Sequence, residues 1–235
     1  MVAIALGLVL GWVGAGLLTR LSEYLASGRA LLGPPHCPGC GAALRGPNLP
    51  LVARSCPACG ARAKPPIWLE AAAIGGTAVV VWRLWGTPEI FVGVLVLWLA
   101  IASTAIDMRL RIIPNRLLAG AALLGLLAMI PLGAGAFAQG ALGTVVLFAV
   151  AALLAVVGRG GFGFGDVKYL AVVGLLLGLD AGIVSLLAAV LLGGLYAAML
   201  LATRRAGRKD TFAFAPFIAI GSVAVLMLWH LPPGH

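Results

Sequence analysis

Eight apolar runs follow one another along the 235-residue chain, and they limit its possible folds more than any other feature. Hydrophobic residues make up 62% of the sequence and charged residues only 10%. A water-soluble domain of this length would leave too much apolar surface in water. A helix needs about 20 residues to cross a bilayer core of about 30 Å, and most of the runs are long enough. The sequence therefore predicts an all-α, multi-span membrane protein with about eight transmembrane helices, at residues 2–18, 66–85, 90–106, 113–130, 138–158, 169–179, 181–203 and 214–231.

The basic residues predict how these helices are oriented. With the N-terminus outside, all of the 16 Lys and Arg residues except Arg83 fall in segments on one side of the membrane. Cytoplasmic loops attract such an excess of positive charge. Residues 20–66 and 204–210 are therefore expected in the cytoplasm. The first run lacks a preceding basic segment and a small-residue cleavage site, which favours a retained membrane anchor over a signal peptide.

The net charge of +9 does not indicate a nucleic-acid partner. Aromatic residues make up 7% of the chain and do not alternate with the basic residues, so no single-strand binding face is expected. The predicted partner of most of the surface is the lipid bilayer.

The sixth run is too short to cross a membrane alone. Residues 169–179 would form a helix of about 16 Å at 1.5 Å per residue. Either this helix begins inside the bilayer, or the sixth and seventh runs fold together in another way. The first alternative suits the Gly-rich sequence before it, because irregular backbone is tolerated at membrane depth beside a wet cavity.

Four cysteines lie close together in the only long polar segment. Two Cys-x-x-Cys pairs are separated by fifteen residues, and each is followed by glycine. This spacing is typical of a structural zinc site with four thiolate ligands, which leaves no open position for chemistry. Two disulfides or redox-active pairs are the alternatives, and a reducing cytoplasm disfavours stable disulfides. We therefore predict a zinc-ribbon-like loop with Cys37, Cys40, Cys56 and Cys59 as ligands and His36 as a bystander.

Two aspartates stand out, because the whole chain holds only seven acidic residues. Asp107 ends the third run, and Asp166 follows the Gly-rich stretch Gly161–Gly165. An ionisable side chain at membrane depth is costly, which makes function its default interpretation. The simpler alternatives are a solvated Asp107 paired with Arg109 or Arg111, and an Asp166 that caps a helix. We expect instead that the two carboxyl groups form one catalytic site at the cytoplasmic face.

Other classes of membrane protein use buried carboxylates as well. A proton- or cation-coupled transporter would use Asp107 and Asp166 as ion ligands within broken helices. A membrane scaffold that docks partners through the cysteine loop is a third alternative, but it leaves the two aspartates unexplained. The absence of an internal repeat and the presence of the cysteine loop favour the enzyme over the transporter.

Taken together, these motifs resemble those of the type IV prepilin peptidases, which are aspartyl proteases of the GxGD class. The resemblance covers nearly the whole chain and depends on motifs in a fixed order: the paired cysteines, Pro66–Glu70, Asp107 with Pro114 and Asn115, Gly163–Asp166 with Lys168, and Phe214–Phe217.

The resemblance implies both an activity and a location. It implies that Asp107 and Asp166 cleave the leader of prepilin-like proteins at the cytoplasmic face of the bacterial inner membrane. Such substrates have a basic leader followed by a hydrophobic N-terminal helix. Many members also methylate the new N-terminus with S-adenosylmethionine. Here the stretch Gly16–Ser22 keeps only the Arg-Leu of the pattern found in bifunctional members, and no S-adenosylmethionine-binding residue is predicted.

The expected domain organisation follows from the same motifs. Residues 1–90 form an N-terminal region with the first two spans and the cytoplasmic four-cysteine loop at 20–66. Residues 91–235 form the membrane-embedded aspartyl peptidase domain.

Overall fold

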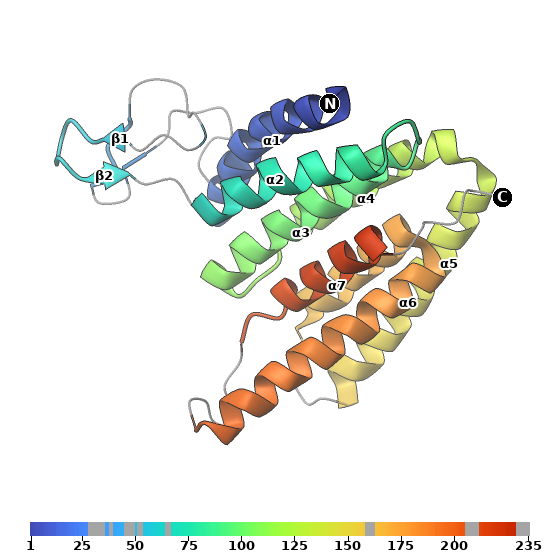
Figure 1. The fold of residues 1–235 in the computed structure, drawn as a ribbon. Helices are drawn as coiled ribbons and strands as arrows, with labels where there is room; N and C mark the ends of the chain where they lie inside the picture. Colours follow the sequence, from blue (N-terminus) through green and yellow to red (C-terminus); the bar gives the residue numbers. More distant parts are fainter. Residues whose placement is uncertain are drawn as a thin grey trace. The chain divides into compact units, whose positions relative to one another are not determined.

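A computed structural model gives the fold as a set of helices with one small cysteine-bearing loop (Figure 1). It describes residues 1–27, 36–37, 40–44, 50, 54–63, 67–157, 163–204 and 212–228. Gly161, Phe162 and the basic residues of 205–209 lie outside these ranges. The chain divides into two compact units, Met1–Trp82 and Arg83–His235.

The first unit contains two helices and a two-stranded sheet. Helix α1 spans Val2–Ser27 and α2 spans Ile67–Arg83, while β1 (Arg54–Ser55) pairs antiparallel with β2 (Arg62–Ala63). The two helices approach closely at glycines. A Cβ on Gly7 would lie 2.6 Å from the Cα of Ala78, and one on Gly11 would lie 2.7 Å from the Cα of Ile74. Residue numbers increase along α1, from 7 to 11, while those of the contacted residues in α2 decrease, from 78 to 74. The two helices therefore run antiparallel.

Helix α1 is longer than the predicted first span. The polar segment was expected from residue 20, yet the helix continues to Ser27. Residues 20–27 contain no proline or glycine, and Leu, Glu, Arg and Ala among them favour helix. The first strong helix breaker is Gly28, directly after the helix ends. The cysteine-bearing segment therefore begins later than the apolar pattern indicates.

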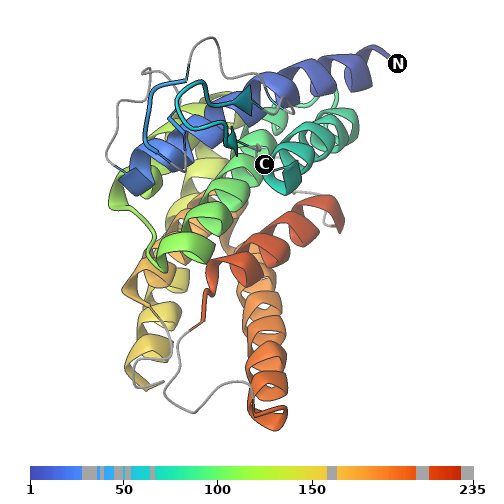
Figure 2. The same cartoon turned by 90° about the vertical axis from the view of Figure 1, so that its left-hand side faces the viewer.

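The second unit consists of helices. They are α3 (Ile90–Leu110), α4 (Asn115–Met129), the short 3₁₀ helix η1 (Ile130–Leu132), α5 (Ala134–Val157), α6 (Phe164–Ala202) and α7 (Ala215–Leu228). Helix α7 packs against both α3 and α6, and α5 packs along α6 (Figures 1 and 2). The start of α6 and the end of α3 are thereby held around the start of α7.

Helix α6 contains a chain reversal and joins the predicted sixth and seventh runs. Gly178 has φ 77° and ψ −176°, which is not helical. A Cβ on Gly182 would lie 3.4 Å from the Cα of Gly174, although residues eight apart in a straight helix are about 12 Å apart. The chain therefore doubles back at Gly178. We name residues 164–177 the first limb of α6 and residues 179–202 the second limb.

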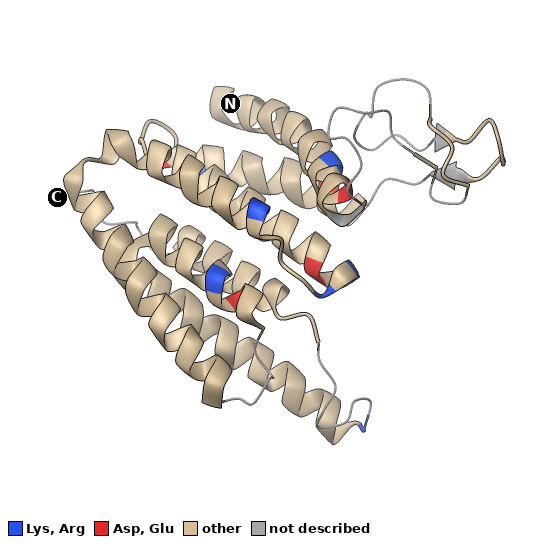
Figure 3. Ribbon diagram, turned by 180° about the vertical axis from the view of Figure 1, so that it is seen from behind, with Lys and Arg blue, Asp and Glu red and all other residues tan. Residues whose placement is uncertain are grey.

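The composition of the helices fits a membrane environment. Five helices of the described chain, namely α1, α3, α4 with η1, α5 and α6, are long and apolar enough to cross a bilayer. Large apolar side chains point outward; Val145 of α5, for example, is 67% exposed. Figure 3 shows that charged positions are sparse along these helices. The predicted fold class, an all-α multi-span membrane protein, is confirmed, whereas the number of eight spans stays a prediction.

Candidate active site and metal centre

The structure brings Asp107 and Asp166 together within the second unit. Asp107 lies in the last turn of α3 and is 5% exposed, and Asp166 lies in the first turn of α6 and is 9% exposed. The two carboxyl groups are close enough to interact electrostatically. Residues separated by two apolar runs in the sequence therefore share one buried environment.

The beginning of α7 supplies a hydrogen-bond donor to Asp107. The main-chain N–H of Ala215, the first residue of α7, donates to Oδ2 of Asp107 at 3.0 Å. Helix N-termini carry unpaired N–H groups and a partial positive charge, so they favour a carboxylate at this position. Pro216 follows directly, and proline is tolerated in a first helical turn because its missing N–H has no helical partner there. From the sequence, Phe214–Phe217 stood out only through a family resemblance, so this contact was not predicted.

Asp166 is tied to the backbone that precedes its helix. Gly163 is the residue at the N-cap of α6, and its N–H donates to Oδ2 of Asp166 at 3.2 Å. Asp166 is therefore the third helical residue and not the cap itself, which corrects the simpler alternative considered from the sequence. This contact resembles half of a capping box, in which the third residue reaches back to the cap N–H. It fixes the direction in which the carboxylate leaves the helix.

The turn after α3 packs directly on the start of α6. Arg111 ends α3 with φ 54° and donates its N–H to the carbonyl of Asp107 at 2.9 Å. A Cβ on Gly165 would lie 3.4 Å from the Cβ of Ile113, so a larger residue at 165 would press on this turn. Glycine at position 165 thus permits the close approach of the two segments that hold the aspartates.

A polar contact strengthens the same junction. Lys168 Nζ donates to Oδ1 of Asn115 at 2.9 Å, across 53 residues of sequence. The ammonium group also lies 5.1 Å from the centre of the Phe164 ring, within cation–π range. In the sequence, Lys168 and Asn115 belong to two separate motifs. The structure shows that they meet and that they connect α4 to the first limb of α6.

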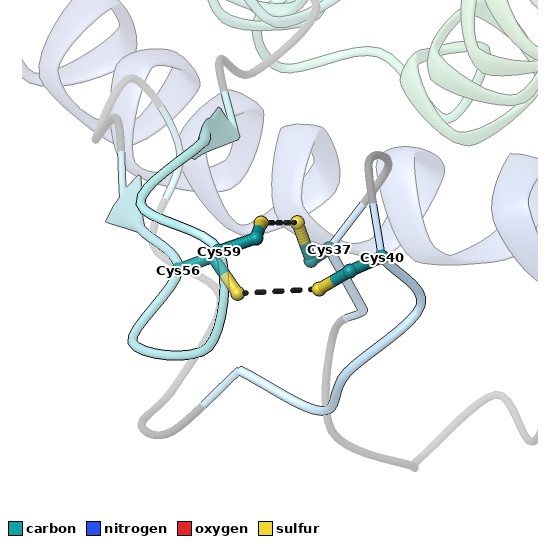
Figure 4. A group of neighbouring side chains, drawn as sticks. All are labelled: Cys37, Cys40, Cys56 and Cys59. Atoms are coloured by element: carbon teal, nitrogen blue, oxygen red, sulfur yellow. Dashed lines mark hydrogen bonds between the residues drawn. The ribbon is translucent and has the colours of Figure 1, made fainter.

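The four cysteines form a second site, within the first unit. Their sulfur atoms all lie within 4.8 Å of one another (Figure 4). The Sγ atoms of Cys37 and Cys59 are 3.6 Å apart, and so are those of Cys40 and Cys56. Sulfurs around a tetrahedral zinc ion, with Zn–S distances of 2.3 Å, would be about 3.8 Å apart. The arrangement therefore fits a tetrahedral metal ion, and all four cysteines are free of disulfides.

The two halves of this metal site have the same local fold. In the first, the N–H of Gly41 donates to the carbonyl of Cys37 at 2.9 Å; in the second, Gly60 donates to Cys56 at the same distance. Gly41 and Gly60 have φ of 73° and 71°, in the left-handed region that favours glycine. The glycine after each pair therefore closes a tight turn that points both sulfurs inward. This explains why each Cys-x-x-Cys pair is followed by glycine.

Part of the chain is similar to known proteins. Residues 94–198 match the type IV leader peptidase family. Over 142 residues the chain is 34% identical to a prepilin leader peptidase/N-methyltransferase of Bacillus subtilis (strain 168), covering 57% of this chain and 54% of the relative. Over 151 residues it is 32% identical to the protein of the same name from Aeromonas salmonicida (strain A449), covering 62% of this chain and 50% of the relative. The chain thus spans about half the length of these curated relatives. No solved structure matches it.

Proposed function

We propose that this chain is a membrane aspartyl endopeptidase that removes the leader of prepilin-like proteins, because residues 94–198 match the type IV leader peptidase family. The observation that supports this proposal most directly is the pair of buried carboxyl groups at the end of α3 and the start of α6. Both aspartates lie within the matched residues. The comparisons give no support to a transporter.

The proposed mechanism uses Asp107 and Asp166 as one acid–base pair. Two nearby carboxylates cannot both be charged without a large energetic cost, so the pair holds one proton. The ionised carboxylate takes a proton from water, whose oxygen then attacks the scissile carbonyl carbon. The protonated carboxyl group gives its proton to the carbonyl oxygen. When the intermediate collapses, the C–N bond breaks and the leaving amine receives a proton from the pair.

The proposed substrate has a basic leader followed by a hydrophobic helix, cut at the cytoplasmic face of the bacterial inner membrane. The outward-facing apolar side chains of the second unit suit a substrate that arrives from the lipid. The charged residues Asp107, Arg109 and Arg111 gather at the end of α3, where a polar leader would leave the membrane. We assign this activity to residues 91–235, and residues 1–90 to a separate region.

We further propose zinc as the metal held by Cys37, Cys40, Cys56 and Cys59. Bound there, it would supply folding energy to the loop and no open coordination position. The names of the relatives include an N-methyltransferase. We therefore include methylation of the new N-terminus, with S-adenosylmethionine as methyl donor, as a second activity to be measured separately.

Cleavage of a prepilin-like peptide by the purified chain in detergent tests the proposal. We expect Asp107→Asn and Asp166→Asn each to abolish cleavage while the metal content stays unchanged. The double variant should be no worse than either single one, because residues that act as a unit are non-additive.

Asp180→Asn is the matched control, because Asp180 also lies in α6 but is exposed. It should cleave like the wild type. Near-normal cleavage by either active-site variant would reject the aspartate pair. Methylation of a substrate that is already cut should survive both active-site changes.

A further inference from the structure

Three helices of the second unit each contain a buried side chain with a hydroxyl group. These side chains belong to Ser103 of α3, Tyr169 of α6 and Ser222 of α7, which are 0%, 1% and 0% exposed. Tyr169 is among the largest fully buried side chains of the described chain. A buried hydroxyl without a hydrogen-bond partner costs free energy, and more so in a membrane protein, where no bulk water can compensate. These groups therefore require an explanation.

The three hydroxyl-bearing residues lie directly behind the aspartate pair. Ser103 precedes Asp107 by four residues and Tyr169 follows Asp166 by three, so each lies about one helical turn from an aspartate on the same helix face. Ser222 follows Ala215, the donor to Asp107, by seven residues or about two turns. Each of the three residues therefore lies deeper in the apolar part of its helix than the aspartate or the Ala215 donor on the same helix.

The contacts of Ser222 determine the direction of the hydrogen bonds. Its hydroxyl donates to the carbonyls of Ile218 and Ala219 at 2.8 and 3.1 Å, so its one proton is used within α7 and its oxygen is free to accept. The side chain of Tyr169 lies near those of Ser103 and Ser222. Among the described residues, neither the Tyr169 hydroxyl nor the Ser103 hydroxyl has a hydrogen-bond partner. For a hydrogen bond to form between Tyr169 and Ser222, Tyr169 has to donate, because the Ser222 proton is already used within α7.

We propose that Tyr169 is a positioning residue whose hydroxyl joins those of Ser103 and Ser222 in a polar layer, and that this layer sets the separation of the Asp107 and Asp166 carboxyl groups. The inference rests on the proposed peptidase function. Each helix of the layer holds one part of the pair: α3 holds Asp107, the first limb of α6 holds Asp166, and α7 holds the Ala215 donor. A change in the layer therefore alters the geometry of the site without touching substrate.

The chemistry of tyrosine suits this role. Apolar packing alone fixes only weakly how far one helix is shifted along its axis relative to its neighbour. Hydrogen bonds between the two helices fix this shift. Phenylalanine would fill nearly the same volume without a hydroxyl. Tyr169→Phe therefore removes the hydroxyl group and leaves the packing in place.

Steady-state cleavage of a prepilin-like peptide by Tyr169→Phe tests the proposal. We expect kcat to fall on the order of tenfold while KM stays within about twofold, because misplaced catalytic groups affect the transition state more than substrate binding. Ser185→Ala is the matched control. Ser185 is another fully buried hydroxyl of α6 without a partner, and it is not among those that contact Tyr169. This control should keep both constants.

The same cleavage assay also separates this proposal from the proposed function. In the same assay, wild-type cleavage that is lost in Asp166→Asn supports the peptidase. With that activity present, an unchanged kcat in Tyr169→Phe would overturn the polar layer, even if the protein unfolded at a lower temperature.

If the wild type cleaves nothing, the proposed function fails, and thermal unfolding in detergent decides on the polar layer alone. Tyr169→Phe and Ser222→Ala should then lower the unfolding temperature together by less than the sum of their separate effects. Additive effects would overturn the layer.

Discussion

The cysteine site of the first unit and the aspartate site of the second are built in opposite ways. The four cysteines lie within 23 residues, and each half of their site is a short turn closed by its own glycine. Asp107 and Asp166 are 59 residues apart and meet only because α3, α4, α6 and α7 pack around them. The first site is therefore a property of local sequence, whereas the second is a property of helix assembly. A change that disrupts one should leave the other intact.

The largest effect is expected from removal of one proposed metal ligand. Cys40→Ser should lose the bound metal, because a structural zinc ion contributes on the order of 10 kcal/mol to the folding of such a site. Metal analysis of the purified protein measures this, and the unfolding temperature of the helices should change little. His36→Ala is the control, since His36 adjoins the first pair without being a ligand. Full metal content in Cys40→Ser would mean that the thiolates do not hold the ion.

The next change disrupts helix packing in the second unit and should leave the metal site of the first unit intact. A Cβ on Gly174 of α6 would meet the backbone carbonyl of Gly143 in α5, which cannot move away as a side chain can. Gly174→Ala should destabilise this unit by about 3 kcal/mol through overpacking. Thermal unfolding in detergent is the measurement, together with metal content, which should not change.

Gly194→Ala is the matched control for the packing change. It lies in the same helix with nothing within 4 Å of its Cβ position, so it should not destabilise. Equal losses in both variants would show that the contact with α5 does not determine the result, since alanine has a higher helix propensity than glycine.

A smaller effect is expected at the junction of α4 and α6. Lys168→Met removes the 2.9 Å contact with Asn115 and should lower kcat/KM for peptide cleavage about tenfold, by loosening the turn that follows Asp107. Asn115→Leu should have a similar effect, and the double variant should be no worse than either. Arg83→Met is the control for loss of one positive charge. Additive losses in the double variant would show that the two residues act separately.

The smallest effect is expected from backbone strain in the cysteine site. Gly60→Ala places a Cβ at φ 71°, where nothing lies within 4 Å, so the change tests conformation alone. It should weaken metal binding about fivefold, which corresponds to about 1 kcal/mol for a left-handed residue. Competition with a metal chelator measures the difference. Gly60→Asn should bind more tightly than Gly60→Ala, since asparagine tolerates this region, and the reverse order would contradict the strain argument.

The two sites also differ in how far sequence could predict them. The spacing of Cys37, Cys40, Cys56 and Cys59 was enough to place all four sulfurs together, because short turns determine their geometry. The meeting of Asp107 with Asp166 was expected only from topology. Which backbone groups contact them could not be predicted, since Ala215 and Gly163 act through main-chain N–H groups that every residue except proline has.

The fold shows the same limit. Apolar runs identified most helices, but α1 continues past its apolar part through residues of high helix propensity. Hydropathy separated runs six and seven but did not show how the chain passes from one to the other. Only the backbone at Gly178 shows the reversal, because glycine adopts left-handed and right-handed φ with equal ease. The pairing of Lys168 with Asn115 depends on that tertiary arrangement and leaves no periodic signal.

The reversal at Gly178 leaves a short helical limb beside the aspartate pair. The first limb of α6 and helix α7 each have 14 residues and so reach about 21 Å, against a bilayer core of about 30 Å. A bilayer beside short apolar helices thins to avoid hydrophobic mismatch. We expect the membrane to be thinnest beside the aspartate pair, where water then has the shortest distance to travel. The length of the lipid acyl chains would thus be an environmental control on how readily the proposed site is hydrated.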